Sequence, residues 1–196
     1  PKSYYDLVRK VDKVIFLDDV SYNNKSWANK TLLKIKSKDY YFRIPIDNAA
    51  EDRLLIKDAK TKNEKWKQHL LKMIRIEHGG DYNFPVAMSL IKNILSFPVD
   101  NIAHVSAYSV FKVAEFMNII PKQKFTFSSV KYSSLNSNFE NKIIEMCRKE
   151  KASEFLALPY TRDVLNPRDF LSFDIKLSFI NSNYPKYSII DKLMDQ

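Results

Sequence analysis

Glycine is almost absent from this chain, and its scarcity limits the kinds of binding site that the chain can build. Only two of the 196 residues are glycine, and they are adjacent, at Gly79 and Gly80. A loop that presses its backbone amides against a diphosphate needs several glycines, because Cβ atoms block the close approach. The phosphate-binding loops of P-loop nucleotidases and dinucleotide-binding folds are therefore excluded.

The composition predicts a folded domain with a substantial core. Hydrophobic residues make up 45% of the chain, which includes 11 Tyr and 13 Phe, and the mean hydropathy is −0.36. These values exclude a disordered chain and a membrane protein. No apolar run approaches the ~18 residues that span a bilayer. No repeat or composition break divides the chain, so we expect residues 1–196 to form a single domain.

Cysteine content and the N-terminal residues indicate the compartment. The chain has a single cysteine, Cys147, so it forms no internal disulfide. The first residues lack the basic, apolar and small-residue segments of a secretory signal. We therefore expect a cytoplasmic protein without membrane insertion, in which Cys147 lies in the core.

The net charge of +9 leaves two interpretations open. The 32 cationic residues are spread along the chain among 23 acidic ones, which is typical of a solvated, lysine-rich surface. Two denser basic runs, Lys34–Lys38 and Lys57–Lys72, could instead attract a phosphate-rich ligand. Such a ligand could be a nucleotide, a nucleotide-sugar, coenzyme A or RNA.

The chain alternates between short β-forming runs and segments of helical periodicity. The apolar spacing predicts helices over residues 4–11, 63–78, 85–95, 100–117 and 138–149. Runs rich in β-formers predict strands over residues 14–17, 31–35, 40–46, 54–56, 124–128, 153–158 and 175–179. This alternation favours the α/β class, which we expect as a mixed β-sheet flanked by helices, with a β-hairpin near residues 31–46.

Two carboxylates follow the first predicted strand, and two serines follow a later one. Asp18 and Asp19 should face opposite ways on an extended backbone, with Asp19 facing a ligand crevice and Asp18 capping a helix or pairing with a cation. If the two strands are neighbours, Ser128 and Ser129 share that crevice with Asp19. The serines otherwise cap the next element. No third ligand stands at a suitable spacing, so we expect no metal site.

Three residues after the first strand combine an aromatic ring, an amide and a cation. Trp27, Asn29 and Lys30 suit the stacking of a base or sugar ring and the binding of a phosphate. The alternative is that Trp27 belongs to the core and Lys30 is solvated.

His69 is the histidine best placed for proton transfer. It stands one helical turn after Trp66, with Lys65 and Lys72 on the same face, and nearby cations favour a neutral imidazole that can act as a base. The alternative is an ordinary histidine on a helix surface. The three histidines are dispersed and no cysteine cluster accompanies them, so zinc is not expected.

The stretch from Tyr4 to Lys30 resembles the opening of WbqC-like proteins, in which an aromatic-rich helix leads into a strand ending in Asp-Asp-Val. The residues that match are Asp12, Asp18, Asp19, Val20, Trp27 and Asn29, and Lys30 stands where the family usually has Arg. Further matches are the strand 42–46, Trp66 with His69, Asn101, Ser128–Ser129 and the end 190–193. The family's N-terminal strand, with its His-Gln-Pro segment, would lie before Pro1. The Gly-containing turn expected near Pro159 is replaced by the sequence ALPYTRDVLN.

The resemblance implies a role in making O-antigen or capsule, through modification of a sugar or nucleotide-sugar. As an enzyme, the protein would transfer an acyl or aminoacyl group to an amino sugar, with acyl-CoA or aminoacyl-tRNA as donor. His69 and Asp19 would then be catalytic, while the substrate would be bound by Asp18, Trp27, Asn29, Lys30, Ser128 and Ser129. The alternatives are a non-catalytic module that binds a sugar-nucleotide or a partner, and an RNA-binding module.

Overall fold

The computed structural model describes residues 2–24, 28–119, 125–135, 138–180 and 187–194. The longer helices are α1 (Lys2–Lys10), α2 (Lys65–His78), α3 (Phe84–Leu95), α4 (Ile102–Phe116) and α6 (Phe139–Lys149). The shorter ones are α5 (Ser128–Lys131), α7 (Pro167–Leu171) and α8 (Ile189–Met194), with 3₁₀ turns at Ile56–Asp58 and Pro159–Thr161. The strands are β1 (Val14–Phe16), β2 (Lys30–Ile35), β3 (Lys38–Arg43), β4 (Phe125–Phe127), β5 (Glu154–Ala157) and β6 (Lys176–Phe179).

The helices begin and end where local side chains can satisfy the backbone. The Asn101 side chain accepts hydrogen bonds from the amides of Ala103 and His104 at the start of α4, and Asn138 caps α6 in the same way. Helix α2 ends against Gly79, as the glycine pair predicts. The five long helices therefore follow the predicted segments within a few residues.

The strands form three two-stranded sheets over the described residues. Strands β1 and β4 are parallel, β5 and β6 are parallel, and β2 and β3 form the predicted antiparallel hairpin. The α/β class is thus confirmed, but three separate strand pairs replace the single mixed sheet that we expected. Local patterning identifies a strand and not its partner, because parallel strands meet only through long crossovers.

Residues 54–56 do not form the predicted strand. Leu55 makes an isolated bridge to Ser21, and Ile56 begins a 3₁₀ turn. The apolar side chain of Leu54 is buried instead with Ala59 and Ile102 in a small cluster. A run of three apolar residues is too short to distinguish a strand from a buried loop.

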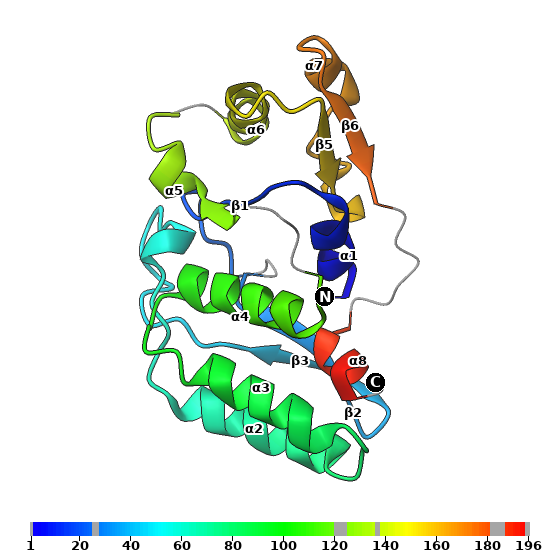
Figure 1. Cartoon of the computed structure of the whole chain (residues 1–196). Coiled ribbons are helices and arrows are strands. Elements are labelled where there is room, and N and C mark those ends of the chain that lie inside the picture. The colour runs from blue at the N-terminus through cyan, green and yellow to red at the C-terminus, as the bar shows by residue number, and fades with distance from the viewer. Residues whose placement is uncertain (1, 25–27, 120–124, 136–137, 181–186, 195–196) are drawn as a thin grey trace.

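Two large hydrophobic cores lie on either side of β1. The first joins α1, the hairpin, α2, α3, α4 and α8, and the second joins α5, α6, β5, α7 and β6. Figure 1 shows these groups in the lower and upper halves of the molecule, with α1 and β1 between them. Val14 and Phe16 pack toward the first core, whereas Ile15 and Leu17 pack toward the second. Burial on both faces explains the unbroken apolar run of β1.

No helix among the described residues is long and apolar enough to span a membrane.

Candidate functional site

The ends of β1 and β4 bring the predicted acidic and serine residues together. The register pairs Phe16 with Phe127, so the residues that follow each strand emerge at the same edge. Ser128 and Asp18 stand 110 residues apart in the chain, yet the Ser128 Oγ lies 3.1 Å from Asp18 Oδ1. The predicted adjacency of these two strands is confirmed.

The carboxylate and the amide of Asp18 form hydrogen bonds with Ser128 and Ser129, the first residues of α5. Its Oδ1 accepts the Ser129 amide at 2.9 Å, its Oδ2 accepts the Ser129 hydroxyl at 2.5 Å, and its own amide donates to Ser128 Oγ at 3.2 Å. Only 3% of the residue is exposed. Asp18 thus caps the first turn of α5 from a different strand and fixes β1 to that helix.

Asp19 is held in an ion pair that sequence analysis did not identify. The Lys142 ammonium on α6 lies 2.7 Å from Asp19 Oδ2, and the Ser128 hydroxyl donates to Asp19 Oδ1 at 2.5 Å. Burial disfavours the charged carboxylate, but the hydrogen bonds from Lys142 and Ser128 outweigh it and hold the pKa of Asp19 below its ordinary value. We call Asp18, Asp19, Ser128, Ser129 and Lys142 the acidic network.

The expectation that the two aspartates face opposite ways is wrong. Both carboxylates reach the hydroxyl of Ser128. The strand ends at Phe16, and the Asp18 amide donates to the carbonyl of Phe16 at 3.1 Å, so the chain turns before either aspartate. The alternation of side chains applies only while the backbone stays extended.

A large cavity lies between the two cores. Its volume is about 1560 Å³, and its lining comes mainly from α1, β1, α4, α6 and β5. Most lining side chains are aliphatic or aromatic, and the polar groups within it include Tyr4, Tyr5, Asp18, Lys30, Ser106 and Ser109. Asp18, and not Asp19, is the member of the acidic pair that borders the cavity, contrary to our expectation.

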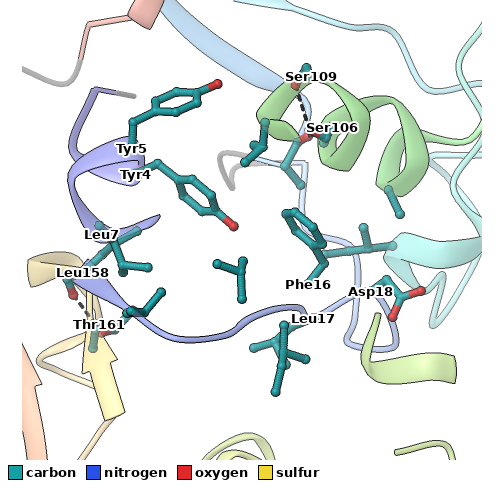
Figure 2. A pocket seen from close by; sticks show the side chains of 18 of the residues that line it. Tyr4, Tyr5, Leu7, Phe16, Leu17, Asp18, Ser106, Ser109, Leu158 and Thr161 are labelled. Atoms are coloured by element: carbon teal, nitrogen blue, oxygen red, sulfur yellow. Dashed lines mark hydrogen bonds between the residues drawn. The ribbon is translucent and has the colours of Figure 1, made fainter. Parts of the chain in front are cut away.

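Two consecutive tyrosines of α1 extend into this cavity, as Figure 2 shows. Neither Tyr4 nor Tyr5 has a hydrogen bond from its hydroxyl to any other described residue, although burial raises the pKa of both hydroxyls. The ring of Phe16 lies nearby, stacked on Phe125 at 5.8 Å between ring centroids. Neither hydroxyl is among the fully buried polar atoms without a partner, so both are accessible from the cavity and are suited to bonding a ligand there.

The polar groups of α4 in the cavity are already satisfied in part. Ser109 Oγ donates to the Ser106 carbonyl at 2.7 Å, and Ser106 Oγ lies 3.5 Å from the carbonyl of Ala28. These serines are therefore less available to a ligand than the tyrosines.

The remaining residues of the predicted Trp27–Lys30 set have different environments. Asn29 is buried and donates from Nδ2 to the carbonyl of Ile44 at 2.9 Å, so it holds the end of β3. Lys30 lines the cavity, and its ammonium lies 5.7 Å from the ring centroid of Tyr41. Trp27 lies outside the described residues. Asn29 and Lys30 both line the cavity, and Lys30 brings a positive charge to it.

His69 is not among the residues that line the cavity. It is exposed on α2, where its ring stacks on Phe42 of β3 with 5.9 Å between centroids. Helix α2 lies across the molecule from α5 and the acidic network (Figure 1). The structure therefore does not bring His69 together with Asp19.

A further carboxylate, that of the half-buried Glu150, was also not identified from the sequence. It accepts the Tyr132 hydroxyl and pairs with the ammonium groups of Lys13 and Lys131. These contacts join α6 to α5 and to the segment that leads into β1. The cysteine prediction is confirmed, because Cys147 is buried on α6, where burial raises the pKa of its thiol to about 11.

One signal could have identified Lys142. It stands three residues after Phe139 and four before Met146, so it occupies the apolar stripe of its helix, where a lysine requires a buried partner. No comparable signal pointed to Tyr4 and Tyr5, because aromatic residues on an amphipathic helix are ordinary core residues. Among the described residues, no group of three or more His, Cys, Asp or Glu side chains could hold a metal ion.

Comparison with known proteins places the chain in a family. The uncharacterised protein Rv1507c of Mycobacterium tuberculosis is 18% identical over 181 residues, which cover 92% of this chain and 77% of the relative. No solved structure matches the chain. The model of the WbqC-like protein family matches residues 1–193. The chain therefore belongs to the WbqC-like protein family.

Proposed function

We propose that this protein is a cytoplasmic transferase of bacterial surface-polysaccharide biosynthesis. In this proposal it modifies an amino sugar, carried on a nucleotide, by acyl or aminoacyl transfer. The observation that carries the proposal is the cavity between the two cores, into which two tyrosine hydroxyls extend that have no hydrogen-bond partner among the described residues.

The size of the cavity suits a ligand larger than a single sugar. Pockets for small molecules usually enclose roughly 300–1,000 Å³. The volume of about 1560 Å³ leaves room for a sugar together with its nucleotide or with part of an acyl donor. Lys30, where β2 meets the cavity, provides a cation for a phosphate.

The chemistry of the lining suits a sugar ring. The hydroxyls of Tyr4 and Tyr5 stay neutral, since burial raises their pKa values, and each can both donate and accept a hydrogen bond. Sugar hydroxyls and N-acyl groups require partners of this kind. The rings of Tyr4 and Phe16 provide apolar faces for the C–H side of a sugar.

Asp18 is our candidate for the carboxylate that meets the amine of the sugar. A carboxylate offers about four acceptor positions. The Ser129 amide donates to Asp18 Oδ1, and the Ser129 hydroxyl donates to Oδ2. The Ser128 hydroxyl, whose one proton is shared with Asp19, also lies 3.1 Å from Oδ1, so Oδ2 receives a single bond from the described residues. The remaining position on Oδ2 can take a proton from the amine as its nitrogen bonds to the carbonyl carbon of the donor. The thioester C–S or ester C–O bond of the donor then breaks, and the released coenzyme A sulfur or tRNA oxygen takes up that proton.

The other predicted residues have supporting roles in this proposal. Asp19, Ser128 and Ser129 fix Asp18, and Asn29 fixes the hairpin beside Lys30. We assign no catalytic role to His69, because a general base must come within ~3 Å of the proton that it removes, and His69 does not line the cavity.

The experiment that tests the proposal is mass spectrometry of nucleotide-sugars in a deletion strain. The expected result is accumulation of a nucleotide-linked amino sugar that lacks one acyl or aminoacyl group. That compound should return to its normal level when the wild-type gene is restored, and should persist with Asp18→Asn. An unchanged nucleotide-sugar pool would refute the proposal, whereas full rescue by a variant with no turnover in vitro would indicate a binding module.

A further inference from the structure

The β2–β3 hairpin concentrates positive charge. Residues 30–43 contain five cationic side chains and one carboxylate, so this short segment carries +4 of the formal net charge of +9. The cations are Lys30, Lys34, Lys36, Lys38 and Arg43. This charge includes one of the two dense basic runs of the sequence, and nothing in the proposed transfer reaction uses more than Lys30.

The register of the hairpin places several of these cations on one face. Residues directly opposite in an antiparallel pair share a face, and here Lys30 stands opposite Arg43 and Lys34 stands opposite Asp39. Tyr41 lies between them, opposite Leu32. The other face carries Leu33 and Phe42, which are buried in the first core.

A further tyrosine extends the face. Tyr187 bridges to Leu32 on the far side of β2, and its hydroxyl donates to Asp39 Oδ1 at 2.6 Å. That bond occupies the acidic group of the face. We call Lys30, Lys34, Tyr41, Arg43 and Tyr187 the hairpin face.

Cations and aromatic rings alternate on the hairpin face. The Lys30 ammonium lies 5.7 Å from the Tyr41 ring centroid, and the Lys34 ammonium lies 5.8 Å from that of Tyr187. Tyr41 is 55% exposed, so its ring is accessible to a ligand on this face. Arg43 is also exposed, while its Nη1 donates to Asn24 and Asn29.

We propose that the hairpin face binds single-stranded nucleic acid, with bases stacked on Tyr41 and Tyr187 and backbone phosphates paired with Lys30, Lys34 and Arg43. Base–aromatic stacking beside a cationic track is the general way in which proteins hold single strands. A duplex hides its base faces, so its bases cannot reach these rings. An anionic membrane would also meet the cations, but insertion favours aliphatic side chains and Trp over two tyrosines beside three cations.

This inference does not depend on the transferase proposal. Lys30 belongs to both the hairpin face and the cavity lining, so the end of a bound strand would lie at the cavity. The binding surface can be tested on the purified chain without any knowledge of the reaction.

The test measures the fluorescence anisotropy of a labelled ten-nucleotide single-stranded RNA on titration with the full chain. We expect binding that weakens with salt, with a slope of log K against log salt near −2, since each of three phosphate contacts contributes about −0.7. Tyr41→Ala should weaken binding by about 5- to 150-fold, the equivalent of one lost stacking contact. Lys34→Ala should reduce the slope by about 0.7.

The matched controls are Phe173→Ala and Arg148→Ala. These residues form another exposed cation–aromatic pair, 4.8 Å from guanidinium to ring centroid. Arg148 lies near the end of α6 and Phe173 follows α7, and both helices lie far from the hairpin (Figure 1). Both controls should bind RNA as the wild type does, and thermal melts should show that all four variants are folded.

Four results would overturn the inference. They are an absence of RNA binding at low salt, equal or tighter binding of a ten-base-pair duplex, equal effects of Tyr41→Ala and Phe173→Ala, and displacement of the RNA by uridine monophosphate at similar concentration. Sedimentation of the chain with phosphatidylserine vesicles in the absence of RNA binding would assign the face to a membrane instead.

Discussion

The acidic network borders the cavity through Asp18, and Tyr4 and Tyr5 line another part of it, but the polar atoms of the two groups differ in their hydrogen bonding. In the network, Asp18 and Asp19 receive hydrogen bonds from Ser128 and Ser129, and Lys142 neutralises Asp19. In the cavity, the hydroxyls of Tyr4 and Tyr5 have no hydrogen bond to another described residue.

This difference separates architecture from ligand binding. A polar group whose bonds are all made within the protein stabilises the fold and has little capacity left for a ligand. A hydroxyl that opens into a cavity and has no partner among the described residues can still form its bonds with a ligand. Asp19 is thus mainly structural, and the cavity, which Asp18 borders, is the better place to look for substrate.

The largest effect should come from breaking the network at Lys142. Lys142→Met keeps the helix and the packing volume but leaves the partly buried Asp19 without its cation, so we expect a loss of about 1–3 kcal/mol in the free energy of unfolding. Urea denaturation measures this loss. Lys149→Met, on the exposed side of the same helix, is the control and should change stability by less than about 0.5 kcal/mol. Equal effects of the two changes would show that the ion pair does not hold α6 to β1.

The pH dependence of stability should follow Asp19. Its pKa is lower in the folded protein than in the unfolded chain, so its contribution is complete above the unfolded value, near 3.9, and is lost as the pH falls through the folded value. Thermal melts between pH 7 and pH 3 should show a smaller loss of stability in Asp19→Asn than in the wild type. Parallel curves for the two proteins would contradict the lowered pKa.

Tyr4→Phe should separate binding from stability in the cavity. The hydroxyl has no hydrogen-bond partner in the part of the chain that the structure describes, so its removal should leave the free energy of unfolding unchanged or slightly higher. Affinity for the nucleotide-sugar that accumulates in the deletion strain should fall about fivefold, the value of one net hydrogen bond. Calorimetry measures this affinity, and Tyr82→Phe, at a tyrosine that is 95% exposed, is the matched control. A stability loss without a change in affinity would place Tyr4 among the architectural residues.

The smallest effect should come from His69→Gln. His69 is exposed and contacts the ring of Phe42, so the change should alter the free energy of unfolding by less than about 0.5 kcal/mol. Turnover per folded molecule should also stay the same. A general base would instead lose roughly 10²–10⁴-fold in turnover, and such a loss in a well-folded variant would restore His69 to the active site.

Local sequence patterns were sufficient to predict most of the helices and strands. The apolar period of α2 and α4, the caps Asn101 and Asn138, and the glycines after α2 concern groups within a few residues of one another. The hairpin follows from alternation on either side of a turn. These features depend on backbone geometry and nearby side chains, which the sequence by itself determines.

The partners of the functional side chains were decided only by tertiary structure. The sequence placed Asp18 and Asp19 after a strand. The turn that follows Phe16 directs both carboxylates toward Ser128, and Lys142 of α6 pairs with Asp19. The sequence likewise placed Tyr4 on an amphipathic helix, whereas the separation of the two cores made the cavity that its hydroxyl enters. The physical reason is that periodicity specifies which face of an element is buried, while the group it meets depends on crossovers that leave no local pattern.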